Sequence, residues 1–145
     1  MLAMFEGKSI EGIEFYNLLY TNDEFCKEFG QAILAAGRLE SVLKQYLNET
    51  VPGEDTSKAT LGRLIKIAEK NPLLRKMVPV LESIRDQRNY FTHNIYALFS
   101  GLVEETILER TGLLDSDVAT YMERAWMLKE NLNGLADIIS RHLNK

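Results

Sequence analysis

Apolar side chains recur every three or four positions along most of this 145-residue chain, the spacing that predicts helices with one buried face. The longest pattern begins at Asn22 or Asp23 and is expected to run to about Asn48. Its predicted buried stripe contains Phe25, Phe29, Ile33, Ala36, Leu39 or Glu40, Leu43 and Leu47. A shorter helix is predicted from Thr60, with a buried side made of Leu61, Leu64, Ile65 and Ala68.

The second half of the chain continues the helical period. Asn71-Pro72 suits the cap and first turn of another helix, because proline fits the first helical position. Pro79 restarts or kinks that helix, and residues from Val80 to about Phe99 then form one continuous pattern. The last helix is predicted from the cap at 115–117 to about His142. Its expected buried stripe is Val118, Tyr121, Ala125, Leu128, Leu132, Leu135 and Ile139.

Three segments depart from this regular pattern. Residues 9–20 are apolar almost all round, so a short buried helix and a strand both remain open. Residues 48–57, NETVPGEDTS, combine turn-forming residues without periodicity and predict an exposed connection. In residues 102–114, LVEETILE fits either a strand pair or a helical turn.

Together these elements predict an all-α fold, a mostly antiparallel bundle of four or five helices, because short connections favour antiparallel neighbours. The length fits a single domain, 1–145, in which residues 1–21 form an N-terminal segment and residues from about 22 to 142 form the bundle.

Composition narrows the classes of function. With 46% hydrophobic and 26% charged residues, the chain has the balance of a soluble globular protein. The 17 Lys and Arg against 21 Asp and Glu, without a run of like charge, argue against a protein that coats nucleic acid through many phosphate contacts. A local site for one or two phosphates remains possible.

Cysteine, histidine and hydropathy exclude other classes. A single cysteine, Cys26, cannot form an intramolecular disulfide, and two distant histidines, His93 and His142, make a structural metal improbable. No cofactor is expected. The N-terminus lacks the pattern of a secretory signal, and no window reaches the roughly 18 apolar residues of a membrane span, so we expect a cytoplasmic location without membrane partners.

One charged residue interrupts the predicted buried stripe of the fourth helix. That stripe runs through Met77, Leu81, Ile84, position 88, Phe91, Ile95 and Leu98. Position 88 is Arg88, and a buried guanidinium is costly unless it is paired or open to a cleft. Arg88 is therefore expected to reach a carboxylate such as Glu40, to line a groove between helices, or to face a second subunit.

A polar column runs along the same helix through Arg85, Asn89, His93 and Tyr96. At roughly 100° per residue, Arg88 and His93 lie about 140° apart on an ideal helix. Convergence of the two on one ligand requires a kink near residues 90–92 or the matching pair from a partner chain.

The stretch Arg88-Asn89-Tyr90-Phe91-Thr92-His93, on a late helix of an all-helical domain, resembles the Arg-polar-x3-His motif of the HEPN superfamily. The resemblance covers residues from about 22 to 142, although only the six-residue motif is specific. It implies a metal-independent endoribonuclease in which the ribose 2′-hydroxyl attacks its own phosphate. His93 would be the general acid or base, Arg88 would hold the scissile phosphate, and Asn89 would orient the histidine or bind a phosphate oxygen. Arg85 and Tyr96, on the same polar column, are candidates for binding the substrate.

The resemblance also implies partners. Domains similar to this superfamily commonly form homodimers in which two motifs face each other across a cleft. The expected roles are the toxin of a toxin–antitoxin pair or an antiphage effector, held in check by a partner protein. Related toxins often carry tyrosine two residues after the histidine, where this chain has Ile95.

The alternative is a non-catalytic helical dimer that binds a protein or a small molecule as a regulatory module. The acidic net charge agrees with it. A sequence-specific DNA binder ranks third, because no helix has a basic recognition face.

Overall fold

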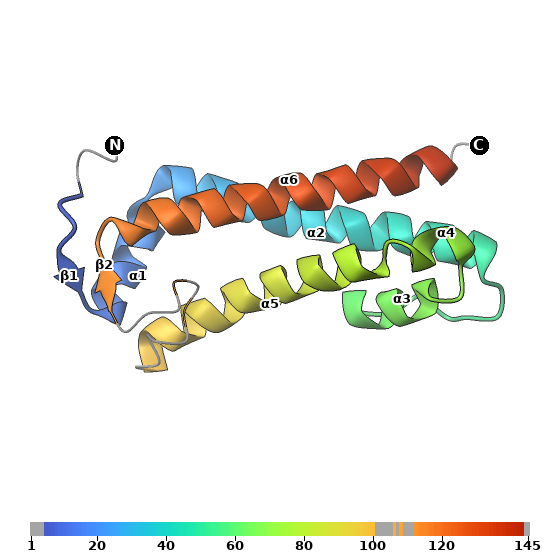
Figure 1. Cartoon of the computed structure of the whole chain (residues 1–145), viewed down its shortest axis with the longest axis horizontal. Coiled ribbons are helices and arrows are strands. Elements are labelled where there is room, and N and C mark those ends of the chain that lie inside the picture. Colours follow the sequence, from blue (N-terminus) through green and yellow to red (C-terminus); the bar gives the residue numbers. More distant parts are fainter. Residues whose placement is uncertain (1–4, 101–105, 107, 109–111, 144–145) are drawn as a thin grey trace. The chain divides into compact units, whose positions relative to one another are not determined.

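The chain is almost entirely helical. The computed structural model describes residues 5–100, 106, 108 and 112–143 (Figure 1). Within these residues it has six helices and a two-stranded sheet, in agreement with the predicted all-α class. The elements in chain order are β1 (Ser9–Ile10), α1 (Gly12–Thr21), α2 (Asp23–Thr50), α3 (Leu61–Ala68), α4 (Pro72–Arg75), α5 (Val78–Ser100), β2 (Leu113–Leu114) and α6 (Asp117–Leu143).

The chain divides into two compact units, each built from segments far apart in sequence, and α2, α5 and α6 each contribute residues to both. The first unit comprises Met1–Gln31 and Gln87–Leu128, and the second comprises Ala32–Asp86 and Lys129–Lys145. The sequence predicts one domain, and nothing in its periodicity marks this division.

The first unit is built around aromatic rings. Phe91 of α5 lies 5.4 Å from Phe29 of α2 and 6.3 Å from Tyr121 of α6, measured between ring centroids. Phe29 contacts Phe25 at 5.5 Å, and Tyr121 contacts Phe15 of α1 at 5.0 Å. Five rings therefore connect segments of four helices, and ring contacts of this kind add to the stability gained from burying apolar area.

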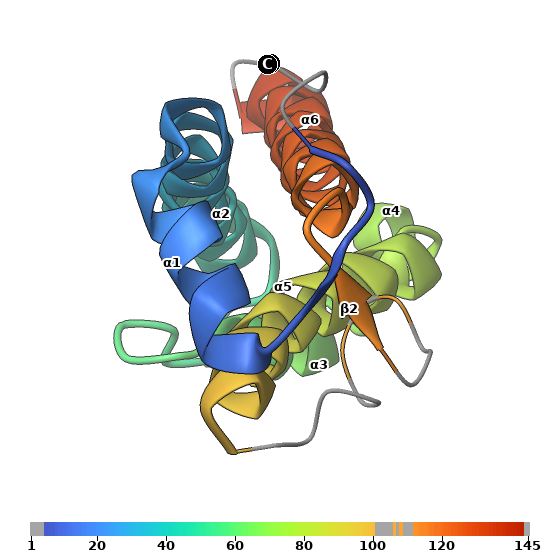
Figure 2. The same ribbon diagram turned by 90° about the vertical axis from the view of Figure 1, so that its left-hand side faces the viewer.

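The N-terminal segment is held to the start of α6. β1 pairs antiparallel with β2, and Figure 2 shows the blue N-terminal segment running beside β2. In this pairing Ser9 lies opposite Leu114 and Ile10 opposite Leu113. Just after β2, the carboxylate of Asp115 accepts hydrogen bonds from the backbone N–H groups of Gly7 at 2.8 Å and Lys8 at 3.0 Å. These bonds fix residues that have no helix of their own.

The N-terminal end of α1 approaches the backbone of α5 at Gly12. A Cβ atom at this position would lie 2.2 Å from the carbonyl oxygen of Leu98, far inside van der Waals contact. The residue is buried, and the backbone fixes the direction of a Cβ atom, so a side chain could not avoid this contact. Glycine at this position allows the two helices of the first unit to pack closely.

The second unit has an aliphatic core. Its buried apolar residues include Leu39, Leu43 and Leu47 of α2, with further leucine, isoleucine, valine and alanine side chains and no aromatic ring among those described. The Oδ1 atom of Asn71 accepts hydrogen bonds from the backbone N–H groups of Leu73 and Leu74, both at 2.9 Å, and so caps α4 as the Asn-Pro pair predicts.

Most of the predicted helix faces are confirmed. Every residue of the stripe expected on the last helix is buried in α6, and the four expected on the second helix are buried in α3. Asn22 caps α2, since its Oδ1 atom accepts a hydrogen bond of 2.8 Å from the N–H group of Phe25. Residues 9–20 contain both of the structures that remained open, the strand β1 and most of the helix α1.

The prediction for one residue of the α2 stripe, Ile33, is wrong. The side chain of Ile33 is 57% exposed, whereas Ala32 and Ala35 are buried. The buried face passes through small alanines, and their weak hydrophobicity does not identify that face in the sequence.

The predicted structure of LVEETILE, residues 102–109, falls almost wholly outside the described residues. Within the described residues, no helix combines the length and apolarity needed to cross a membrane.

Candidate functional site

Arg88, which interrupts the predicted buried stripe of α5, lies at the boundary between buried and exposed surface. Ile84 and Phe91, on either side of it in the stripe, are buried, but Arg88 is half-buried. Arg88 and His93 each interact with another group of the protein. A half-buried arginine keeps part of its guanidinium open to solvent while its aliphatic stem packs against the core.

Asn89, His93 and Tyr96 share the exposed face of α5. All three are exposed, at successive steps of four and three residues, so they lie along one side of the helix as predicted. α5 is a single helix from Val78 to Ser100, without an interruption at residues 90–92. The angular separation of about 140° between Arg88 and His93 therefore remains.

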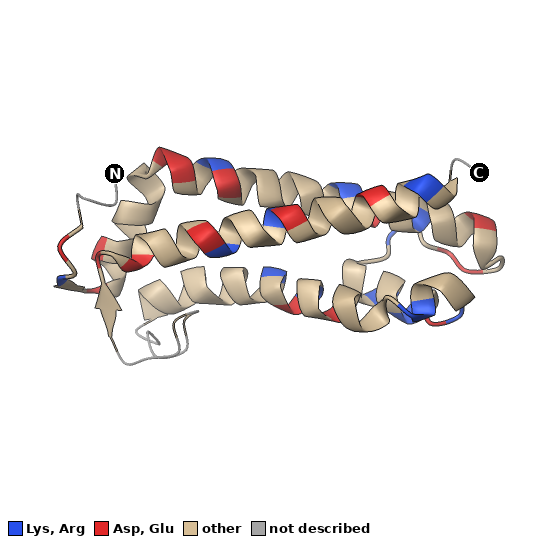
Figure 3. Ribbon diagram, turned by 45° about the horizontal axis from the view of Figure 1, so that its top comes forward, with Lys and Arg blue, Asp and Glu red and all other residues tan. Residues whose placement is uncertain are grey.

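The exposed face that carries His93 is uncharged. From Asn89 to Ser100, α5 contains no Lys, Arg, Asp or Glu, and this part of the ribbon is uniformly tan in Figure 3. Arg88 is thus the last charged residue of the helix. A phosphate beside His93 would meet no carboxylate from α5 itself.

Aromatic side chains continue this face across α1. Tyr16 lies 4.7 Å from Phe99 and 6.0 Å from Tyr20, between ring centroids. Tyr20 is 71% exposed, Phe99 54% and Tyr96 65%. Tyr16, Tyr20, Tyr96 and Phe99 are called the aromatic surface below. The sequence gives little sign of it, because residues 9–20 do not reveal which apolar side chains are buried.

Arg85, one turn before Asn89 on α5, belongs to the second unit. Its guanidinium donates to the Oδ1 atom of the neighbouring Asp86, from Nε at 3.2 Å and Nη2 at 3.1 Å. Its Cδ atom lies 3.8 Å from the position that a Cβ on Gly62 would occupy, so the stem packs against α3. Glu40, a candidate partner for Arg88, also belongs to the second unit.

Buried polar side chains of the first unit are the feature that sequence reasoning missed. Asn94, directly after His93, is completely buried, and neither its Oδ1 nor its Nδ2 atom has a hydrogen-bond partner in the described part of the chain. The buried hydroxyl of Thr106 also has none there, although its carbonyl oxygen accepts a 2.5 Å bond from the Tyr90 hydroxyl. Glu28 is buried too, one turn after Phe25 in α2. Counting three residues on from Phe91 and Phe25 would have found Asn94 and Glu28.

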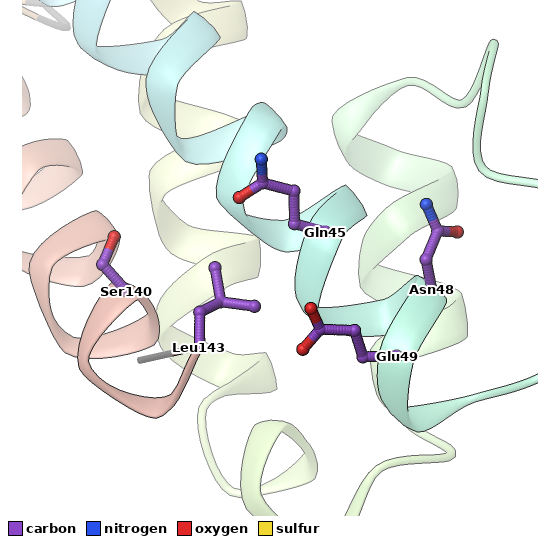
Figure 4. Close-up of a pocket in the computed structure, with 5 residues that line it drawn as sticks. All are labelled: Gln45, Asn48, Glu49, Ser140 and Leu143. Atoms are coloured by element: carbon purple, nitrogen blue, oxygen red, sulfur yellow. The ribbon is translucent and has the colours of Figure 1, made fainter. Parts of the chain in front are cut away.

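An open, largely polar hollow lies in the second unit. Figure 4 shows Gln45 and Glu49 of α2 facing Ser140 and Leu143 of α6, with Asn48 also on its wall. The Oδ1 atom of Asn48 already accepts a hydrogen bond of 2.7 Å from the hydroxyl of Thr56. Among the described residues that line the hollow, Glu49 alone is titratable. The hollow contains none of the residues that the sequence selects as a site.

Metal-ligand geometry and comparison with other proteins give no further information about this site. Within the described residues, no group of three or more His, Cys, Asp or Glu side chains is arranged to hold a metal ion. No protein-family model, no curated protein and no solved structure matches the chain. The site must therefore be judged by its own residues.

Proposed function

We propose that the protein is a metal-independent endoribonuclease similar to HEPN toxins or antiphage effectors. The observation that carries this proposal is the position of the motif on α5. His93 and Asn89 are exposed on an uncharged helix face, and Arg88 stands half-buried where the helix period calls for an apolar residue. An exposed imidazole can transfer protons near neutral pH, and a fixed guanidinium charge suits the developing charge on phosphorus.

The proposed reaction is an internal transfer at phosphorus. The ribose 2′-hydroxyl loses its proton to a general base and its oxygen forms a bond to the adjacent phosphorus. The bond from phosphorus to the 5′ oxygen breaks, and that oxygen receives a proton from a general acid. The products are a 2′,3′-cyclic phosphate and a 5′-hydroxyl. His93 acts as one of the two proton-transfer groups, Arg88 neutralises the phosphorane oxygens, and Asn89 orients the imidazole or binds an oxygen.

A homodimer would complete the site. Five residues of α-helix separate Arg88 from His93 by about 7.5 Å along the axis as well as by the angle described above. Two copies related by a twofold axis would place Arg88 of one copy opposite His93 of the other. The exposed aromatic surface beside His93 supports an interface there, since exposed apolar patches commonly mark interaction sites.

Cleavage of single-stranded RNA in the presence of EDTA tests the proposal. We expect wild-type protein to form cyclic-phosphate ends, and His93→Ala and Arg88→Ala to lower the rate by about 100-fold or more. His142→Ala is the matched control, because it removes the chain's other histidine and should cleave at the wild-type rate. Equal cleavage by all four proteins, or by none of them, would refute the assignment.

The second candidate is a non-catalytic dimer that binds a regulatory partner. The aromatic surface favours it as well, because rings exposed in the monomer gain most by being covered. Under this function, Tyr20→Ser with Phe99→Ser would convert a dimer into a monomer in sedimentation, while His93→Ala would change neither assembly nor binding.

A further inference from the structure

Charge is divided unevenly between the two units. The first unit contains five Lys and Arg against 12 Asp and Glu, a net of −7, and the second contains 12 against nine, a net of +3. The whole-chain value of −4 conceals this difference. The unit that carries Arg88 and His93 therefore repels polyanions as a whole, and the other unit attracts them.

The positive charge of the second unit is concentrated around α3 and α4. Residues 58–76 contain one acidic residue, Glu69, and six cations, and Figure 3 shows the corresponding blue bands on α3 and α4. All six are exposed, and they are called the basic surface below: Lys58, Arg63, Lys66, Lys70, Arg75 and Lys76.

Most of these cations are available to a ligand. Arg63 and Lys70 share the carboxylate of Glu54, to which Arg63 donates at 3.3 Å, so the two lie close together. Lys66 is between them in sequence and one helical turn from Arg63. The other cations, Lys58, Lys66, Arg75 and Lys76, have no ion-pair partner in the described part of the chain.

The chemistry of this surface favours a phosphodiester backbone over a protein or a membrane. The large apolar side chains of α3, including Leu61, Leu64 and Ile67, are buried, and no large apolar residue between 58 and 76 is exposed. Protein interfaces usually have an apolar core with aromatic anchors, and membrane-surface helices bury an apolar face. A hydrophilic surface of positive charge matches nucleic-acid backbones, whose binding depends on Lys and Arg contacts to phosphates.

We propose that the basic surface of α3 and α4 binds the phosphodiester backbone of RNA, independently of base sequence, as a docking site separate from Arg88 and His93. The choice of RNA rests on the proposed function. The inference that this surface binds a phosphodiester backbone does not depend on that function. The surface supplies the attraction that the acidic first unit lacks. His93 and the 2′-hydroxyl requirement then select the bond to be cleaved.

Direct binding to protein that carries His93→Ala tests the docking site without cleavage. The probe is a labelled single-stranded RNA of about 20 nucleotides, measured by fluorescence anisotropy at several salt concentrations between 50 and 200 mM, a range over which phosphate contacts weaken strongly. The test variant adds Lys66→Glu and Lys76→Glu. The matched control adds Lys8→Glu and Lys27→Glu, two exposed lysines of the first unit with the same change in charge.

We expect the test variant to weaken RNA binding by about tenfold or more. Each lost phosphate contact should also reduce the slope of log affinity against log salt by about 0.7 for a single strand. The control variant should retain most of the affinity. Equal weakening in both variants, or no weakening in the test variant, would overturn the proposal. Lys66→Gln with Lys76→Gln, checked by circular dichroism, should weaken binding less than the glutamates without altering the fold.

Two further probes separate the possible ligands. Single-stranded DNA of the same sequence should bind through the basic surface with similar affinity, as backbone recognition requires. A polyglutamate peptide that binds more tightly than RNA would overturn the proposal in favour of an acidic protein partner. A protein that binds RNA through this surface but never cleaves it would refute the proposed nuclease alone, and one that cleaves with unchanged binding in the test variant would refute the docking site alone.

Discussion

The two units stabilise their interiors with different chemistry. The first joins five aromatic rings and buries polar side chains, two of which, Asn94 and Thr106, retain unpaired groups within the described residues. The second packs aliphatic side chains, and its buried polar residues Thr56 and Asn71 are both hydrogen-bonded. The first is strongly acidic and the second basic.

This difference indicates that the two units have different roles. An unpaired buried polar group costs about 1–3 kcal/mol, and folds accept that cost mainly where function requires it. Asn94 adjoins His93 in sequence, so the cost falls in the unit that carries the candidate site. The second unit satisfies its buried groups and offers its cations at the surface, as a stable platform for binding would.

The largest test of the comparison removes one core side chain from each unit. Phe91→Ala should lower the free energy of unfolding by about 3–5 kcal/mol, because its ring contacts both Phe29 and Tyr121. Leu43→Ala in the second unit should lower it by about 2–5 kcal/mol. Urea unfolding is followed by the fluorescence of Trp126, the chain's one tryptophan, which belongs to the first unit.

We expect Phe91→Ala to move the Trp126 transition to lower urea than the far-ultraviolet circular dichroism transition, and Leu43→Ala not to do so. If both variants shift both signals equally, the units unfold together and the comparison has no thermodynamic meaning.

A smaller effect is expected at the cap of α4. Asn71→Ala removes the acceptor for the N–H groups of Leu73 and Leu74 and should cost about 1 kcal/mol, within a range of about 0.5–2. Thermal unfolding measures the loss. Asn71→Asp keeps an acceptor at the same place and should retain most of the stability.

At Asn94, a substitution is expected to increase the free energy of unfolding instead of lowering it. Asn94→Leu replaces an unpaired buried amide with an apolar side chain of similar shape and should raise the free energy of unfolding by about 1 kcal/mol. A loss of stability on this substitution would mean that the amide is hydrogen-bonded in solution, and Asn94 would then no longer distinguish the two units.

The smallest expected effect is the acid dependence of Glu54. A hydrogen bond from Lys70, with the positive charges of Lys70 and Arg63, lowers the pKa of Glu54 below its ordinary value. A depressed folded-state pKa contributes stability above the unfolded value of about 4.3, and that stability is lost as the pH falls through the folded value. Urea midpoints measured between neutral and acid pH should therefore fall less steeply for Glu54→Gln than for wild type.

Asp115 provides the matching measurement in the first unit. Desolvation opposes the effect, but hydrogen bonds from the backbone N–H groups of Glu6, Gly7, Lys8 and Ser116 lower the pKa of Asp115. The sign is the same, so Asp115→Asn should also flatten the acid dependence. An unchanged pH profile in either variant would show that protonation of its carboxylate is not linked to folding.

Local sequence signals predicted the helices well, and non-local features were missed. The α6 stripe and the Asn71-Pro72 cap follow from periodicity and capping, which act within a few residues. For residues 9–20 the sequence left a strand and a helix open, because the two residues of β1 form a strand only by pairing with Leu113–Leu114, about 100 residues away. For the site, periodicity found Arg88 and the exposed face of His93. It found Tyr96 of the aromatic surface but missed the rings of α1, because their exposure depends on which neighbours cover residues 9–20. Asn94 was also missed, although its place three residues after the buried Phe91 is itself a periodicity signal.

The first unit is built from two segments that are far apart in the sequence, and this affects when it can fold during synthesis on the ribosome. Its segment Met1–Gln31 emerges long before its partner segment, which ends at Leu128. At 5–20 residues per second, the interval is roughly 5–20 s. For the first part of that time, Phe25 and Phe29 have no contact with Phe91, because Phe91 is synthesised 60 residues after Gln31, and Tyr121 follows only near the end of the interval. The aromatic core of this unit must therefore assemble late, after the segment that contains Tyr121 has been synthesised.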